Sequence, residues 1–215
     1  MFSFGPLDLL VPVLMILLTV VYLPITVVFL LKDLKFSHLV SWHAFQNAWF
    51  ERFWAFFGSV SMPLFTSDVE TVLANASGVV LDVGPGSGAW MYLFSPRRNP
   101  NISKLLLLEP NENFHQSLKM TAEEHGLAGR YEILGNGTTS LEKIGIQTGS
   151  IDTITTVHVL CSVSQPHILI KDLYRYLKPG GQWLVYEHVR VKGKGAFIAY
   201  WQAAINIIWL QSGVQ

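Results

Sequence analysis

The sequence feature that most restricts the fold is a run of 23 residues, Leu9 to Leu31, that contains no acidic or basic side chain. As an α-helix this run would be about 34 Å long, enough to cross the hydrocarbon core of a bilayer. A buried core helix is a poor alternative, because the run has no polar face. Residues 1–35 are therefore predicted to form a membrane anchor. The residues that interrupt the apolar run are Pro12, Thr19, Pro24 and Thr26.

The flanks of the run favour an uncleaved anchor over a cleaved signal peptide. Asp8 precedes the run, whereas a signal peptide has Lys or Arg there and a shorter apolar core. Lys32 and Lys35 follow it, so the positive-inside rule predicts that the next domain faces the cytosol. The two prolines leave two arrangements open, a spanning helix or a hairpin that enters and leaves one leaflet.

Residues 36–63 form a predicted spacer that is rich in aromatic side chains. Between Trp42 and Phe57 the aromatic residues fall at helical spacing, with polar residues between them. This pattern predicts an amphipathic helix that lies at a membrane surface or covers a pocket. An ordinary helix that faces a protein core has the same pattern, and the sequence does not distinguish the two.

Residues 64–215 have the texture of an α/β domain. Apolar runs occur at Val79–Val83, Leu105–Leu108, Tyr131–Leu134, Ile151–Val159 and Gln182–Val189, with helical patterns at Asn113–His125 and Pro166–Leu177. Buried strands that alternate with helices predict a doubly wound, Rossmann-like parallel sheet with helices on both faces. Such sheets bind ligands beyond the carboxyl ends of their strands.

The strongest local motif is Asp82-Val83-Gly84-Pro85-Gly86-Ser87-Gly88, at the end of the first predicted strand. Glycines allow positive φ and close approach of a ligand, and we expect a helix to follow whose free N–H groups face that ligand. Glu109 ends the second predicted strand, 21 residues after Gly88, where an acid can bind ribose hydroxyls. Together these features predict a nucleoside ligand, and both NAD and S-adenosylmethionine fit them.

Three further features resemble class I methyltransferases. Asp82 stands two residues before the first glycine of the turn, as in that family. Leu177-Lys178-Pro179-Gly180-Gly181 resembles the turn before the family's fifth strand, and Ser150-Ile151-Asp152-Thr153-Ile154 resembles the entry to its fourth. The resemblance implies S-adenosylmethionine as the cofactor, and the turn at 178–181 disfavours an NAD-type oxidoreductase.

Two segments narrow the resemblance to the membrane-anchored methyltransferase-like protein seven family. They are Val159-Leu160-Cys161-Ser162-Val163 with Pro166, and Glu187-His188-Val189. That family also begins with an apolar anchor. The resemblance implies S-methylation of a small lipophilic thiol at the endoplasmic reticulum or lipid droplets. Nucleic acid is not an expected partner, because 15 Lys and Arg balance 15 Asp and Glu and no basic run exists.

The same resemblance assigns the cofactor site. The residues concerned are Asp82, Gly84, Pro85, Gly86, Gly88, Glu109, Asn111, Gly137 and Thr138. The turn and Asp82 would hold the methionine end, and Glu109 with Asn111 would hold the ribose. Thr138 stands where the family usually has an acid near the adenine, and a hydroxyl accepts a hydrogen bond more weakly than a carboxylate.

His158 and His188 follow the fourth and fifth predicted strands and are the candidate catalytic bases. The alternative is that each is a strand-end residue with a hydrogen-bonding role. Cys161, the chain's one cysteine, is interpreted as a small buried residue rather than a nucleophile. The sequence predicts no metal site.

The C-terminal segment reads differently from class I methyltransferases, which usually end in an antiparallel strand hairpin. Phe197–Leu210 has a helical pattern, and the five residues after it are too few for two strands. We therefore expect the final hairpin to be missing. A non-enzymatic alternative is a truncated, catalytically weak domain that serves as a membrane-anchored binding protein.

Overall fold

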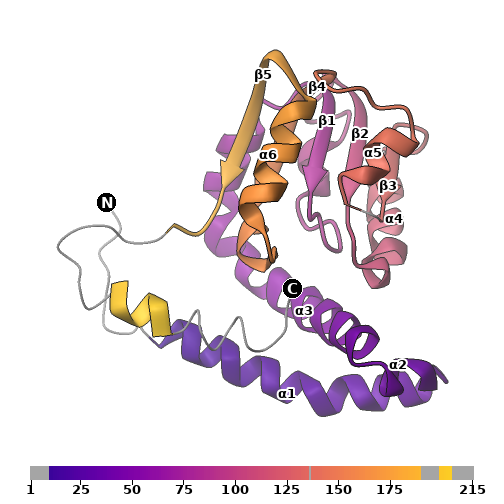
Figure 1. Ribbon diagram of the computed structural model, residues 1–215, viewed down its shortest axis with the longest axis vertical. Coiled ribbons are helices and arrows are strands. Elements are labelled where there is room, and N and C mark those ends of the chain that lie inside the picture. The colour runs from indigo at the N-terminus through magenta and orange to yellow at the C-terminus, as the bar shows by residue number, and fades with distance from the viewer. Residues whose placement is uncertain (1–9, 136, 190–198, 205–215) are drawn as a thin grey trace. The chain divides into compact units, whose positions relative to one another are not determined.

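The computed structural model describes residues 10–135, 137–189 and 199–204 (Figure 1). Contacts within the chain divide it into two compact units, residues 55–188 and residues 1–54 with 189–215. The expected loss of a final hairpin falls on residues outside the described ones, as does most of the predicted helix Phe197–Leu210, of which residues 199–204 are helical.

The first unit contains the predicted anchor as helix α1 (Val11–Lys32), followed by α2 (Phe36–Val40) and the start of α3 (Trp42–Leu73). Its segment Pro12–Lys32 is long and apolar enough to cross a membrane, with a mean hydropathy of 2.7. Only 17% of its most apolar window is buried, unlike the core helix of a soluble protein. The hydroxyls of Thr19 and Thr26 donate to carbonyl oxygens of their own helix, so neither exposes an unsatisfied polar group.

Within this unit, α1 contacts the first turns of α3. The indole N–H of Trp49 donates to the carbonyl oxygen of Thr19 at 2.8 Å, and the rings of Tyr22 and Phe53 meet edge-on at 6.2 Å. The predicted aromatic helix is confirmed, but it continues through Pro63 to Leu73, well into the predicted methyltransferase domain.

The second unit is built on a five-stranded parallel sheet. The strands are β1 (Gly78–Val83), β2 (Ile102–Leu108), β3 (Tyr131–Leu134), β4 (Ile151–Val157) and β5 (Leu177–Tyr186). Their order in the sheet is β3-β2-β1-β4-β5. Alternating side chains of each strand fill a core on either face, which confirms the predicted α/β fold.

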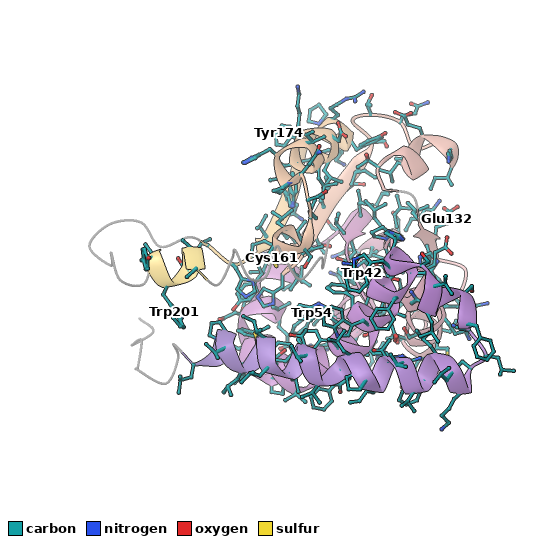
Figure 2. All side chains as sticks on the ribbon, turned by 60° about the horizontal axis from the view of Figure 1, so that its bottom comes forward. Trp42, Trp54, Glu132, Cys161, Tyr174 and Trp201 are labelled. Carbon is teal, nitrogen blue, oxygen red and sulfur yellow. The ribbon has the colours of Figure 1, made fainter. Side chains whose placement is uncertain are left out.

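Helices cover both faces of the sheet. One core joins the second half of α3, the 3₁₀ turn η2 (Met91–Phe94) and α4 (His115–Glu124) to β1 and β2. The other joins α5 (Thr139–Lys143) and α6 (Pro166–Tyr176), which lie in front of the strands in Figure 1. Tyr174 lies on the outer face of α6 and is 68% exposed (Figure 2). Two short 3₁₀ turns, η3 (Glu112–Phe114) and η4 (Leu160–Ser162), follow β2 and β4.

Two predictions about local structure are wrong. The helix expected after the glycine turn is only the four-residue η2, because Ser95-Pro96 follows closely and a residue before proline disfavours helix. The fifth strand begins at Leu177 rather than Gln182. A register shift between Ile151 and Thr153 of β4 accommodates the predicted turn residues within β5.

Candidate functional site

The candidate site lies at the point where the order of strands in the sheet reverses. From β1 the chain runs outward to β2 and β3, and then returns to place β4 on the other side of β1. All five strands are parallel, so their carboxyl ends share one edge. Every predicted site residue follows a strand or ends it, so the topology brings them all to this edge. Ligands of doubly wound sheets bind at such a switch point.

Two of the three glycines in the turn after β1 have different constraints. Both have positive φ, +66° at Gly84 and +57° at Gly86. A Cβ at Gly84 would overlap the side chain of Val159, so this glycine lets the β1 and β4 loops pack together. A Cβ at Gly86 would have only the ring of Phe114 within 4.0 Å. The Gly86 side of the turn therefore faces open space that a ligand can fill.

Glu109 binds this turn directly. One carboxylate oxygen accepts a hydrogen bond from the N–H of Gly86 at 2.9 Å, and the other accepts from the N–H of Asn111, also at 2.9 Å. The side chain of Asn111 in turn accepts from Asn113, which fixes the loop after β2. Burial raises the pKa of Glu109, although both backbone hydrogen bonds oppose the rise. The structure thus brings together the two strongest sequence signals.

Asp82 is the second buried acid of the site and is 7% exposed. It lies opposite Thr155 of β4, whose hydroxyl donates to its carboxylate at 2.6 Å. Burial raises the pKa of Asp82 to about 7; the Thr155 hydrogen bond opposes the rise, and the nearby charge of Glu109 adds to it. Asp82 therefore carries a proton in much of the cofactor-free protein near neutral pH.

Gly137 and Thr138 follow β3, which β2 separates from β1. The carbonyl oxygen of Thr138 accepts from the N–H of Leu141 at the start of α5. The predicted cofactor residues thus follow β1, β2 and β3, three neighbouring strands in the sheet. His158 and His188 follow β4 and β5, on the other side of β1.

The structure stacks the two predicted histidines on each other. The ring centroids of His158 and His188 are 4.5 Å apart, and the rings are within 15° of parallel. Burial lowers the pKa of His158 to about 4, with a further contribution from His188, and burial also lowers the pKa of His188. The stacked pair is therefore uncharged at neutral pH.

Two aromatic residues that the sequence did not single out lie beside these histidines. Phe65 of α3 meets the His158 ring edge-on at 4.9 Å, and Tyr186 of β5 lies 5.1 Å from that ring. We call Phe65, His158, Tyr186 and His188 the ring cluster. Tyr186 lies within the predicted fifth strand and could have been suggested by its strand-end position. Phe65 lies 93 residues before His158 and had no local signal.

Glu187 was quoted as part of a motif but was not predicted as a site residue. Its carboxylate accepts hydrogen bonds from the N–H groups of Val159 and Leu160, at 3.0 Å and 3.2 Å. This acid therefore ties the loop after β4 to the end of β5. The prediction that Cys161 is buried is wrong, because the residue is exposed. Its thiol lies 3.6 Å from the carbonyl oxygen of His158.

Comparisons with known proteins agree with this geometry. A family described as a methyltransferase domain matches residues 62–210. The chain is 30% identical to thiol S-methyltransferase TMT1B of Homo sapiens over 144 residues, which cover 66% of this chain and 55% of that protein. It is 28% identical to human thiol S-methyltransferase TMT1A over 131 residues, 60% of this chain and 50% of that protein. The chain spans about half the length of the curated relatives it matches.

A solved structure shares the fold. It is described as an S-adenosyl-L-methionine-dependent methyltransferase from Methanococcus maripaludis, and it aligns with a TM-score of 0.51 at 15% identity. The alignment covers 75% of this chain and 71% of that chain. At this identity the likeness supports the arrangement of sheet and helices alone.

The raised pKa of Asp82 leads to a test on the cofactor-free protein. A folded-state pKa near 7 against an unfolded value near 3.9 means that the folded state binds the extra proton between these pH values. The stability of the native protein should therefore fall as the pH rises from about 4 to 7, by at most about 4 kcal/mol from this group. Asp82→Asn should lack this loss, so thermal unfolding should show the variant gaining on the native protein between pH 5 and pH 8.

The matched control is Asp172→Asn on α6, where the acid forms a surface ion pair with Arg175. This variant should follow the native protein across the same pH range. If Asp82→Asn and the native protein changed in parallel with pH, Asp82 would have an ordinary pKa in the folded state.

Proposed function

The chain belongs to the methyltransferase-domain family, and on this premise we propose that it transfers a methyl group from S-adenosylmethionine to a small lipophilic thiol. By family and fold it is a class I S-adenosylmethionine-dependent methyltransferase. The observation that carries the proposal is the hydrogen bond between the Gly86 N–H and the Glu109 carboxylate at the switch point of the sheet. The match to the methyltransferase family favours S-adenosylmethionine over the alternative of an NAD-type oxidoreductase. That alternative has the same glycine turn and the same acid.

Two features of the structure support a cofactor site at the glycine turn. The open space beside Gly86 lies at the turn, next to the two buried carboxyl groups of Asp82 and Glu109. A ligand with a sulfonium and an ammonium group would favour the ionised forms of both acids. We assign the cofactor to these groups and their neighbours along the carboxyl edge. The full set is Asp82, Gly84, Pro85, Gly86, Gly88, Glu109, Asn111, Gly137 and Thr138.

When bound, S-adenosylmethionine would supply a methyl group on a positively charged sulfur. The acceptor thiolate would form the new S–C bond as the sulfonium C–S bond breaks. The departing sulfur would keep that electron pair, and the thiol proton would pass to solvent. The chain's task is alignment of the reacting groups and exclusion of water. His158 and His188 lie on the acceptor side in this proposal. Their lowered pKa values make them weak bases, so we expect the thiolate to form in solvent.

Two observations support a thiol as the acceptor. The curated relatives are named thiol S-methyltransferases, and the acceptor side of this chain has uncharged rings instead of a strong base. A thiol is a much stronger acid than an alcohol, so a fraction of it ionises in solvent, whereas an alcohol needs a general base at neutral pH. The surface and chemistry therefore suit a lipophilic thiol better than an alcohol.

The glycine turn gives a direct test of cofactor binding. Gly86→Arg places a side chain in the open space of the turn, so we expect calorimetry to show no binding of S-adenosylmethionine or S-adenosylhomocysteine. Some strain is expected from the φ of +57°, but no side-chain overlap, so the variant should still fold. Gly84→Ala is the contrasting variant, because its Cβ overlaps Val159 and should lower the melting temperature. Normal cofactor binding by folded Gly86→Arg protein would remove the basis of the assignment.

The acceptor is tested by turnover with purified full-length protein in detergent. Methylation of an alkyl thiol should exceed that of a matched alcohol or phenol at every pH. The rate should rise with pH by up to about tenfold per unit and should not level off below about pH 8.5, the pKa of a cysteine thiol, because a simple alkyl thiol is a weaker acid than cysteine. A rate that levelled off near pH 6 would instead indicate a protein base. Faster methylation of alcohols or phenols would contradict the thiol assignment.

We further propose that α1 anchors the protein in the endoplasmic reticulum or lipid-droplet membrane, with the methyltransferase domain in the cytosol. The apolar, largely exposed helix supports insertion, and Lys32 and Lys35 at its end support the orientation. A fluorescent reporter fused after residue 35 should resist alkaline carbonate extraction and stay accessible to protease added from the cytosolic side. A carbonate-soluble fusion would contradict the anchor, and a protease-protected reporter would contradict the orientation.

A further inference from the structure

Asp82 and Glu109, the two buried acids of the site, receive hydrogen bonds from different kinds of donor. The carboxylate of Glu109 accepts from two backbone N–H groups, those of Gly86 and Asn111. Asp82 accepts from a side chain, because the hydroxyl of Thr155 is its one hydrogen-bond donor among the described residues. A buried carboxylate is unfavourable unless donors surround it. The ionised form of Asp82 therefore depends on a single hydroxyl group.

Thr155 is placed to hold the Asp82 carboxyl group. It lies directly across from Asp82 in the register between β4 and β1, and it is fully buried. Its hydroxyl oxygen lies 2.6 Å from Oδ1 of Asp82, a distance typical of a hydroxyl that donates to an ionised carboxylate. Threonine is branched at Cβ and has few rotamers open to it in a strand, so the position of its hydroxyl is restricted.

The charged groups around Asp82 come from β2 and from the helices above it. Asp82 points to the face of the sheet that α3 and α4 cover, as Val80 does. Glu109, after β2, is the described group whose charge acts on Asp82, and it disfavours ionisation. The other partly buried ionisable groups on the second half of α3 and on α4 bind partners elsewhere. They are Asp68 and Glu70, bound to Tyr186 and Arg98, and His115, bound to the carbonyl oxygen of Glu109.

We propose that Thr155 is a positioning residue for the cofactor: its hydroxyl orients the Asp82 carboxyl group and favours the ionised form, and binding of S-adenosylmethionine releases the proton of Asp82 to solvent. This inference rests on the proposed function, because it takes Asp82 as part of the cofactor site. The ammonium and sulfonium groups of the ligand would favour the carboxylate. Charge balances in this step, since one proton leaves as one negative charge appears on Asp82.

The pH dependence follows from the protonation of Asp82 before the cofactor binds. Burial raises its pKa to about 7, so below this pH the cofactor-free protein must lose a proton on binding. The affinity should therefore fall by up to about tenfold per pH unit below pH 7 and level off above it. Calorimetry at pH 6 with purified full-length protein in detergent, in buffers of different ionisation enthalpy, counts the protons released. We expect the native protein to release nearly one proton more than Asp82→Asn does.

Thr155→Val removes the hydroxyl and leaves a side chain of the same shape. Loss of a donor to the carboxylate should raise the pKa of Asp82 by about one further pH unit. S-adenosylmethionine should then bind about tenfold more weakly than to the native protein at pH 6, but within about twofold of it at pH 8.5. Comparison with the native protein at each pH cancels the titration of the cofactor itself. NMR of the Asp82 carboxyl carbon should show the same rise in pKa in the cofactor-free protein.

Thr153→Val is the matched control. Thr153 lies on the same strand and the same face and is also fully buried, but its hydroxyl binds the backbone of Ser77 at the other end of β4. This variant should follow the pH profile of the native protein. Thr155→Ser keeps the hydroxyl and should follow that profile too. Thr155→Ala is a second variant without the hydroxyl, for use if Thr155→Val does not fold.

The outcomes separate this inference from the proposed function. A loss of affinity in Thr155→Val that is equal at every pH would show that the hydroxyl is only structural and would overturn the inference. Equal proton release by the native protein and Asp82→Asn, or the same profile in Thr155→Val and Thr153→Val, would also overturn it. Failure of the native protein to bind S-adenosylmethionine at any pH would contradict the proposed function, while the NMR titration without cofactor would still test the link between Thr155 and Asp82.

Discussion

The position of β1 at the centre of the sheet is the constraint on which the rest of the site depends. β1 pairs with β2 on one side and β4 on the other, so the loops after all three strands meet at its carboxyl end. Asp82 takes a hydrogen bond from Thr155 across one of these pairings, and Gly84 lets the β1 loop pack on Val159 of the other. The proposed cofactor side and the proposed acceptor side are thus joined through a single strand.

Three acids hold the loops of this edge in place. Glu109 binds the N–H of Gly86, Glu187 binds the N–H groups of Val159 and Leu160, and Asp82 binds the hydroxyl of Thr155. A buried carboxylate is unfavourable unless donors surround it, and removing a donor would leave that penalty uncompensated. Each of these hydrogen bonds joins two different loops or strands. Because a buried carboxylate needs its donors, the same bonds also fix the relative positions of those loops and strands.

The parts that could be predicted from the sequence are those with a local signal. The strands were found because each is a short apolar run, and Asp82, the glycines and Glu109 because they follow such runs. The prediction of a helix after the glycine turn was wrong because Ser95-Pro96 ends the helical segment after four residues. The apolar residues before it favour a longer helix. Phe65 was missed because only the packing of α3 on the sheet brings it to His158. The lowered pKa of that histidine depends on the same packing.

The two sides of β1 differ in charge, and the proposed reaction depends on both. The carboxyl groups of Asp82 and Glu109 lie on the proposed cofactor side, where a positively charged cofactor would favour their ionised forms. The ring cluster provides uncharged surface on the other side, where the acceptor would approach. Transfer of a methyl group from a sulfonium to a thiolate removes both charges, so the transition state has less separated charge than the reactants. Uncharged rings that exclude water therefore favour the transition state over the separated ions, and a cation at the same place would stabilise the thiolate instead. The neutrality of His158 and His188 is, on this argument, as important to the acceptor side as the acids are to the cofactor side.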